Sequence, residues 1–447
     1  MHRNSTDVST KQQRIATLAK QSPQMAFTSL AYLMDIDWMK EAYRRTRKDG
    51  AVGVDGMTAE EYEQDLEGNL QRLLDRAKAG TYRAPPVRRV HIPKGGSTTE
   101  TRPIGIPTLE DKILQRAIVM LLEPIYEQDF LDCSYGFRPG RSAHQALTSF
   151  RDQLMNCRGG YVLEVDIRKF FDNLDHGHLC TFLQLRVRDG VLLRLIGKWL
   201  NAGVMEDGSV SYPDSGSPQG GVVSPIASNV FLHYVLDLWF EQEVKPRLKN
   251  RAFLIRFADD FVIGFSDLCD AQRVMDVVPK RFGKYGLTVH PTKTKLVPFR
   301  SPSSMAKDRD EPRDRPGTFD LLGFTHYWAR SRSGHWVVKL KTATDRFSRA
   351  VRSIDSWCHD NRHLPLREQQ QKLNQKLRGH YAYYGVTGNS ASLTRFLHEV
   401  ERRWRKWLLR RNRERVLSWQ LFRRLLQRFP LAKVRTVRSV YRHAANP

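Results

Sequence analysis

The sequence has little of what marks secreted, disulfide-bonded or zinc-stabilised proteins. Its 447 residues include only five cysteines, an odd number, and no Cys-x-x-Cys pair, so neither a disulfide framework nor a zinc ribbon is expected. The group His176, His178 and Cys180 lacks the second ligand pair of a zinc site. The N-terminus lacks the apolar segment of a signal peptide. These absences indicate a reducing compartment.

A membrane span is not expected either. The most apolar long stretch, residues 220–240, contains Pro225, Asn229, His233 and Asp237, which a membrane-spanning helix rarely holds. This stretch instead predicts a helix in a buried core.

Acidic residues are scarce relative to basic ones. The chain has 73 Lys and Arg against 48 Asp and Glu, a net charge of +25 and a pI near 10.0. This balance favours a polyanionic partner, above all nucleic acid, although a basic protein without such a partner is the alternative. Residues 341–447 alone carry 25 basic and 7 acidic side chains. Because most of the excess lies in this last quarter, we expect two parts with different tasks.

Local patterns predict an α+β fold. Thr58 and Glu61 form a capping box that opens an amphipathic helix ending at Gly80. Further helices are predicted over residues 109–130, 220–240 and 270–285, and from about residue 342 onward. Strands are predicted over residues 87–94, 161–166, 252–265 and 318–341. The polar stretch 301–317 is predicted to be a surface loop.

Three aspartates stand out in apolar surroundings. Asp166 ends one predicted strand, and Asp259 and Asp260 lie at the bend of the hairpin 252–265. If these strands are neighbours in one sheet, the carboxylates converge and repel, and divalent cations would relieve the repulsion. Two Mg²⁺ ions at such a site activate a 3′-hydroxyl and stabilise a leaving pyrophosphate. The alternative is that Asp260 is a turn residue and Asp166 caps the next helix, each plausible singly.

Seven sequence blocks resemble one enzyme family. "FADD", "VDIRKFFDNLD" and "SGSPQGGVVSPIASNVFLH" resemble motifs C, A and B of reverse transcriptases. "RPIGIPTLEDKILQRAI", "YGFRPGRSAHQAL", "LTVHPTKTK" and "LLGFTHYW" occur in the order found in group II intron-encoded reverse transcriptase/maturases. The resemblance covers residues 35–430, and the ordered set is far more specific than "ADD" alone.

The resemblance implies a right-hand polymerase fold with an antiparallel palm sheet. The expected parts are an N-terminal extension (1–35), fingers and palm (36–341), a basic all-α thumb/maturase domain (342–430) and a short basic tail (431–447). No His, Asn and Cys cluster of the HNH type follows, so the short form without an endonuclease domain is expected.

The resemblance also implies the catalytic centre. Asp166, Asp259 and Asp260 would be catalytic and would bind two Mg²⁺ ions, for which Mn²⁺ could substitute, with the backbone carbonyl of Ile167 as a further ligand. Phe171 falls at the position that excludes a 2′-hydroxyl. Ordinary core packing is the alternative for Phe171, and its neighbour Phe170 could equally take that role.

Further residues match nucleotide-binding and nucleic-acid-binding positions of the family. Lys94, Arg102, Gln219 and Lys293 would contact the incoming nucleotide, with Lys295 an alternative to Lys293. Template, primer or RNA contacts are expected from Arg138, Arg141, Leu322, Gly323, Arg402, Arg403, Arg405 and Arg410. Trp404 and Trp407 lie three residues apart on one helical face, which favours core packing for at least one of them.

The expected activity is RNA-directed DNA synthesis from deoxynucleoside triphosphates, an RNA template and a DNA or RNA primer. Binding of structured group II intron RNA as a maturase that assists splicing and retrotransposition is expected beside it. The alternatives are a host-adopted relative acting in phage defence or DNA repair, and a splicing-only RNA-binding maturase. A bacterial cytoplasmic location, at the nucleoid or on RNA, is expected.

Overall fold

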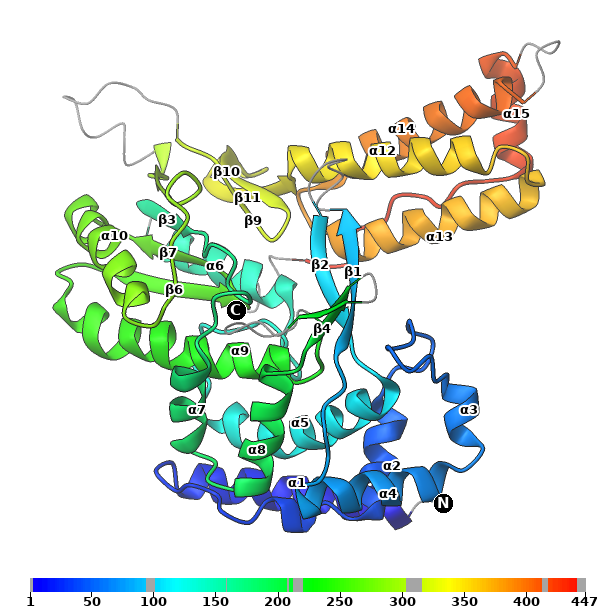
Figure 1. Ribbon diagram of the computed structural model, residues 1–447. Helices are drawn as coiled ribbons and strands as arrows, with labels where there is room; N and C mark the ends of the chain where they lie inside the picture. The colour runs from blue at the N-terminus through cyan, green and yellow to red at the C-terminus, as the bar shows by residue number, and fades with distance from the viewer. Residues whose placement is uncertain are drawn as a thin grey trace. The chain divides into compact units, whose positions relative to one another are not determined.

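A computed structural model describes residues 3–93, 101–157, 159–206, 209–211, 220–302, 316–411 and 417–439. The chain forms two compact units (Figure 1). The first comprises Met1–Phe150 and Tyr161–Leu296, and the second comprises Arg151–Gly160 and Val297–Pro447. The chain is thus a mixed α/β protein, as predicted, while the expected domain bounds stay predictions.

The first unit is mostly helical around two sheets. Its helices are α1 (Arg3–Gln21), η1 (Ala31–Leu33), α2 (Ile36–Arg45), α3 (Ala59–Glu63), α4 (Leu66–Ala79), α5 (Leu109–Asp129), α7 (His176–Gln184), α8 (Gly190–Leu200), α9 (Ser224–Leu232), η2 (His233–Asp237), η3 (Trp239–Val244), η4 (Lys245–Arg247) and α10 (Leu268–Gly283). Helix α6 (Ala143–Asn156) passes from the first unit into the second.

Helix α5 forms the centre of the first unit's core because it is apolar on nearly all sides. Ile113, Leu114, Ala117 and Leu121 are all fully buried. Helix α1, in the segment expected to be an N-terminal extension, packs along α5. The predicted apolar helix over 220–240 is confirmed as α9 followed by the π-helical turns η2 and η3.

The helix predicted over residues 57–80 is wrong as a single element. Its capping box at Thr58 forms, and Gly80 ends it with a left-handed φ of 81°. Between them the chain leaves the helix at Asp65, separating α3 from α4. The Asp65 carboxylate lies against the first turn of α4, where Gly68 leaves space for it, and pairs with Arg72 at 2.8 Å. An acid at a helix N-terminus favours a new helix start.

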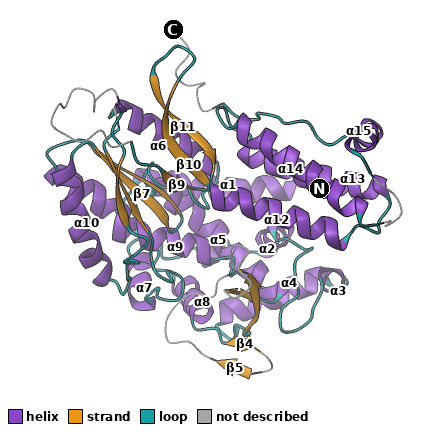
Figure 2. Ribbon diagram, turned by 90° about the horizontal axis from the view of Figure 1, so that it is seen from above, coloured by secondary structure: helices purple, strands orange, loops and turns teal. Residues whose placement is uncertain are grey.

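One sheet, whose strands belong to the first unit apart from the last two residues of β8, carries the aspartates. Its order is β6 (Ala252–Phe257), β7 (Asp260–Phe265), β3 (Tyr161–Val165) and β8 (Lys295–Pro298). Both β6 and β3 pair antiparallel with β7. Figure 2 shows α10 beside this sheet, and α10 packs on β3 and β7. The strands that carry the aspartates are therefore neighbours in one sheet, which was the condition for the carboxylates to converge.

The second sheet of the first unit has the order β2 (Thr101–Ile106), β1 (Val87–Pro93), β4 (Val204–Glu206) and β5 (Ser209–Ser211). Strands β1 and β2 pair antiparallel, with Arg102 opposite Ile92. The residues between these two strands, including Lys94, lie outside the described part of the chain.

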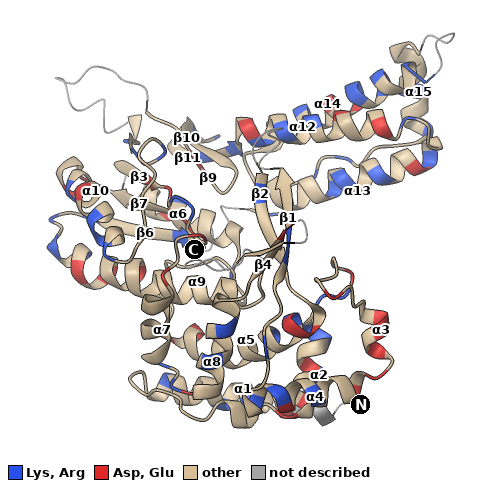
Figure 3. Cartoon of the chain, viewed as in Figure 1, with Lys and Arg blue, Asp and Glu red and all other residues tan. Residues whose placement is uncertain are grey.

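The second unit combines a small sheet with a helical bundle. Its strands are β9 (Phe319–Leu321), β10 (Phe324–Arg330) and β11 (Trp336–Thr342), in the order β11-β10-β9. Its helices are α12 (Thr344–Asp360), α13 (Leu366–Tyr384), α14 (Ser390–Leu409) and α15 (Trp419–Arg428). The predicted strands and the basic helical segment are confirmed. Figure 3 shows Lys and Arg along all four helices.

Both tryptophans of α14 support this bundle. Trp404 is fully buried and donates from Nε1 to Gln369 at 2.9 Å, so its core role is confirmed. Trp407 is partly buried and donates to Asp355 at 2.8 Å. Among the described helices, none is long and apolar enough to cross a membrane.

Candidate active site

The β6–β7 hairpin closes on the two adjacent aspartates. Phe257 pairs with Asp260, so Ala258 and Asp259 form a two-residue turn between the strands. Ala258 adopts a left-handed φ of 57°, which costs a non-glycine residue on the order of 1 kcal/mol. Asp259 therefore projects from a strained turn, whereas Asp260 begins β7 and is exposed.

Asp166 follows the last residue of β3 and lies next to this turn. Val165 is paired with Phe261, so the register places Asp166 opposite Asp260. On the other side of Asp166, its backbone carbonyl accepts from His290 at 2.7 Å, and Lys293 Nζ lies 3.3 Å from its carboxylate. One end of the sheet thus brings together the three aspartates and a lysine.

The charge of Asp259 is shaped by its surroundings. Burial raises the pKa of Asp259 above its ordinary value, a backbone hydrogen bond and Arg102 lower it, and Asp166 raises it further. The charge of Arg102 favours ionised Asp259 and so couples the β1–β2 hairpin electrostatically to the turn. Carboxylates next to a strained turn, together with the cations Lys293 and Arg102, suit a ligand that carries both phosphates and a metal ion.

The oxygen donors near the turn fit divalent cations. Neighbouring residues of a strand direct their carbonyls to opposite sides, so the Ile167 carbonyl faces away from the segment that binds Asp166. Within the described residues, no group of three or more His, Cys, Asp or Glu side chains forms a metal cluster on its own. Mg²⁺ needs only one or two carboxylates beside water and substrate phosphates, which Asp166 and Asp259 can supply.

The two phenylalanines in the turn after β3 differ in burial. Phe170 is buried and stacks edge-on against Phe231, so it takes the core role. Phe171 is only partly buried and contacts Phe170 at 5.3 Å between ring centroids. The position of Phe171 leaves it a face at the surface, as a residue beneath an incoming sugar would need.

Of the other residues predicted to contact the nucleotide, some lie near the aspartates and others do not. Lys293 faces Asp166, whereas Lys295 pairs with Glu164 at 3.3 Å, so the geometry favours Lys293 as the residue near the site. Gln219 lies outside the described residues. The next residue, Gly220, has a φ of 121°, and a Cβ there would lie 2.2 Å from the Gly105 carbonyl oxygen.

Arg138 makes its contacts inside the first unit, and the template contact expected of it stays a prediction. Its side chain is buried and bonds to Glu127, and to the carbonyls of Leu131 and Ser134 at 2.8 and 2.9 Å. Arg141 is more accessible, although it pairs with Asp132 at 2.5 Å. Of this pair, only Arg141 retains a surface that nucleic acid could contact.

Leu322 and Gly323 form the two-residue turn between β9 and β10. Both have positive φ, 50° and 80°. The Tyr383 hydroxyl donates to the Leu322 carbonyl at 2.7 Å, and a Cβ on Gly323 would lie 2.9 Å from the Tyr384 hydroxyl. The turn is thus held by α13 of the same unit.

The four predicted RNA-binding arginines, three in α14 and Arg410 directly after it, make contacts within the bundle. Arg402 and Arg403 pair with Glu399 at 2.8 and 3.3 Å. Arg405 donates to the Leu417 carbonyl and lies 4.5 Å from the Trp419 ring centroid, and Arg410 lies 4.9 Å from that of Trp407. These contacts orient the side chains, and their RNA-binding role stays a prediction.

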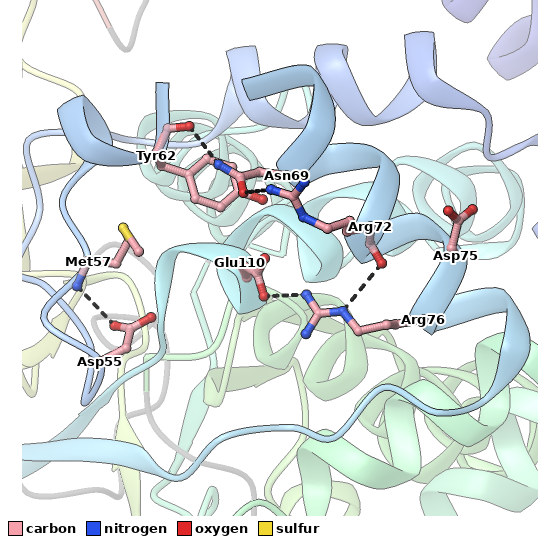
Figure 4. Close-up of a pocket in the computed structure, with 8 residues that line it drawn as sticks. All are labelled: Asp55, Met57, Tyr62, Asn69, Arg72, Asp75, Arg76 and Glu110. Carbon is pink, nitrogen blue, oxygen red and sulfur yellow. Dashed lines mark hydrogen bonds and ion pairs between the residues drawn. The ribbon is translucent and has the colours of Figure 1, made fainter. Parts of the chain in front are cut away.

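A cavity of about 670 Å³ in the first unit contains none of the predicted site residues (Figure 4). Its walls include Tyr62, Asn69, Arg72, Arg76 and Glu110. Arg76 pairs with Glu110 at 2.7 Å, and Arg72 bonds to Asn69 at 2.6 Å, so charged groups in its wall satisfy one another. This cavity lacks the chemistry of an active site.

Two supporting residues escaped the sequence analysis because their contacts depend on the folded structure. Gln115 accepts from the amides of Val222 and Val223 at 2.7 and 3.2 Å, holding the start of α9. Arg256 donates to the carbonyl of Ala258 in the turn. The only signal in the sequence was an arginine inside an otherwise apolar strand.

Comparison with known proteins agrees with this geometry. Residues 92–326, more than half of the chain, match the family model described as reverse transcriptase (RNA-dependent DNA polymerase). Residues 346–426 match the group II intron, maturase-specific domain. The first match contains the aspartate sheet, and the second contains most of the basic helical bundle.

Three curated proteins illustrate the similarity. Protein YkfC of Escherichia coli (strain K12) is 39% identical over 51% of this chain and 61% of its own length. The group II intron-encoded protein LtrA of Lactococcus lactis subsp. cremoris is 35% identical over 53% of this chain and 40% of its own length. An uncharacterized 91 kDa protein in the cob intron of Schizosaccharomyces pombe is 23% identical over 83% of this chain and 52% of its own length.

Proposed function

Because the chain belongs to the reverse transcriptase family, we propose that it is an RNA-directed DNA polymerase. It extends a DNA or RNA primer along an RNA template with deoxynucleoside triphosphates. The observation that carries the proposal is Asp259 on a hairpin turn, next to Asp166 on the adjacent strand and within the electrostatic reach of Arg102.

In this proposal the fold is a right-hand polymerase. The sheet β6-β7-β3-β8 is the palm, the β1–β2 hairpin belongs to the fingers, and helices α12 to α15 form the thumb. The turn Leu322–Gly323 supports the primer end, and Arg141 contacts the template. The antiparallel pairing of β6, β7 and β3 supports the palm assignment.

Two Mg²⁺ ions, for which Mn²⁺ can substitute, would activate the primer 3′-hydroxyl and stabilise the leaving pyrophosphate. Asp166, Asp259 and the Ile167 carbonyl would hold the cations, and exposed Asp260 would have an accessory role. In the reaction, the primer oxygen bonds to the α-phosphorus, the bond from that phosphorus to pyrophosphate breaks, and the hydroxyl proton passes to solvent water.

The remaining site residues orient the nucleotide. Arg102 offers a forked contact to the triphosphate, while Lys94 and Lys293 act as point charges. Gln219 lies along the nucleotide, and Phe171 excludes a 2′-hydroxyl. The ion pair between Lys293 and Asp166 supports this role, because a lysine this close to Asp166 can also contact a phosphate bound next to it.

Primer extension on poly(rA)/oligo(dT) with Mg²⁺ tests the activity. The wild-type chain should extend the primer, and Asp259→Asn, which keeps the side-chain shape but removes the charge, should reduce extension to background. Asp276→Asn, an exposed aspartate change on α10, is the matched control and should extend as the wild type does. Absent extension by the wild type, or full extension by Asp259→Asn, would refute the proposal.

A maturase role is a second candidate because residues 346–426 match the maturase-specific domain. Here the basic helices bind structured group II intron RNA and assist its splicing. Filter binding should show that Arg402→Glu and Arg410→Glu weaken binding to an intron transcript and make its salt dependence less steep. Arg47→Glu, an exposed change in the first unit, should not. Equal binding to unrelated structured RNA would favour a relative adopted for defence or repair.

A further inference from the structure

A buried arginine lies directly behind the turn that carries Asp259. Arg256 is the penultimate residue of β6, and no part of its side chain reaches solvent. A guanidinium has five N–H donors. The five bonds run to Asp237 Oδ1 and Oδ2 (2.8 and 2.6 Å), Asn229 Oδ1 (2.9 Å), Ser134 Oγ (2.8 Å) and the Ala258 carbonyl (3.0 Å).

The bond to Ala258 bears directly on the site. The Ala258 carbonyl belongs to the peptide group that leads into Asp259, so fixing this oxygen fixes the plane from which the Asp259 backbone departs. Ala258 has a φ of 57°, a conformation that an alanine keeps only where its surroundings hold it there. Arg256 supplies such a restraint from inside the unit.

The turn is also restrained by a second contact, which belongs to the same hydrogen-bond network. Gly136 lies so close that a Cβ there would be 2.2 Å from the Ala258 nitrogen. Asn229, whose side-chain oxygen accepts from Arg256, donates from Nδ2 to the Gly136 carbonyl at 2.7 Å. One chain of hydrogen bonds therefore links both restraints on the turn.

An ion pair with both partners fully buried is a costly way to add stability, because each charge loses its hydration. The first unit contains a comparison. Arg186 is also buried, pairs with Asp129 at 2.8 Å and donates to four carbonyls, but its partners lie in α1, α5 and the segment after α1. Arg186 joins structural elements, whereas Arg256 is bonded to the turn itself.

We propose that Arg256, held by Asp237 and Asn229, is a positioning residue that sets the Asp259 turn in the geometry needed for divalent-cation binding and primer extension. This role rests on the proposed polymerase function. A residue that acts this way should alter the turnover number and the Mg²⁺ requirement, and should alter nucleotide KM less.

The test compares Arg256→Lys with the matched variant Arg186→Lys. Lysine keeps the positive charge but cannot make five forked bonds, so each variant loses part of its network. Arg256→Lys should lower kcat 10- to 100-fold and raise the half-saturating Mg²⁺ concentration several-fold. Arg186→Lys should lower thermal stability at least as much, with kcat and Mg²⁺ dependence within about twofold of wild type.

Hydrogen exchange measured on the peptide covering residues 252–265 tests whether Arg256 holds the turn, and this measurement does not depend on enzymatic activity. The turn amides should exchange faster in Arg256→Lys and unchanged in Arg186→Lys. Unchanged exchange, or equal losses of kcat in the two variants, would overturn the positioning role. If the wild type fails to extend primers, the polymerase proposal fails, while hydrogen exchange still decides whether Arg256 holds the turn.

Ser134→Ala is the milder variant if Arg256→Lys does not fold. It removes one acceptor from the guanidinium and leaves the other four bonds in place. It should raise the Mg²⁺ requirement and turn exchange in the same direction by a smaller factor. Wild-type values for both quantities in Ser134→Ala would also count against the proposal.

Discussion

Replacing Gly136 by alanine should damage catalysis more than it damages folding. The added Cβ would lie 2.2 Å from the Ala258 nitrogen and 2.9 Å from the Phe257 carbonyl carbon. Ordinary contacts at a Cβ begin at 3.4 Å, so the two backbone segments must separate by about 1.2 Å. Neither neighbour is the end of a flexible side chain, so the movement falls on the turn that holds Asp259.

A displacement of this size has two consequences. Overpacking of a well-packed region costs about 1–3 kcal/mol of unfolding free energy. Misplacement of a catalytic group by about 1 Å costs on the order of 100-fold in rate. We therefore expect kcat for primer extension to fall about 100-fold in Gly136→Ala, with the protein still folded at 25 °C.

Two further glycine variants separate these effects. Gly197→Ala in α8 adds a Cβ with no atom within 4 Å, and should leave kcat and stability near or above the wild-type values. Gly264→Ala adds a Cβ 2.3 Å from the Phe253 ring at the far end of the same hairpin, and should lower stability with a small effect on kcat. A kcat within threefold of wild type for Gly136→Ala would refute the reasoning.

Three other predictions follow from single contacts. Phe171→Val should raise ribonucleotide incorporation in primer extension, and an unchanged ratio of ribonucleotide to deoxynucleotide use would mean that the selecting residue lies elsewhere. Burial raises the pKa of Asp111 to about 6. Its protonated carboxyl therefore adds about 3 kcal/mol to the free energy of unfolding below pH ~4, and this contribution is lost as the pH rises through 6. In urea unfolding at a series of pH values, Asp111→Asn should lack this part of the pH dependence. Trp404→Ala should lower the unfolding free energy of the helical bundle by about 3–5 kcal/mol, and a loss below 1 kcal/mol in urea unfolding would contradict its core role.

Much of the fold could be predicted because its signals are local. Apolar patterning located α5 and the strands around Asp166 and Asp259, and cap residues marked both ends of the predicted helix over 57–80. The break at Asp65 could not be predicted from periodicity. It depends on how one carboxylate lies over Gly68, which is a contact between side chain and backbone.

In the candidate site too, local sequence patterns identified some residues, whereas others depended on contacts in the folded structure. The acids were visible because charges are rare in apolar strands, and the register of β3 with β7 places them at one end of a sheet. The contacts of Arg138 could not be predicted, because its bonds to Glu127 and two carbonyls depend on how the loop after α5 folds. The choice between Lys293 and Lys295 also required the structure, since both lysines lie in the same short segment.

In the basic helical bundle, tryptophan rings orient arginine side chains that could contact phosphates. Arg405 and Arg410 lie over Trp419 and Trp407, and such contacts restrict a long side chain while leaving its charge intact. A restrained arginine loses less conformational entropy on meeting a phosphate than a free one does. Stacked arginines should therefore contribute more affinity per charge than isolated exposed lysines, which is what a structured RNA partner with a fixed backbone path requires.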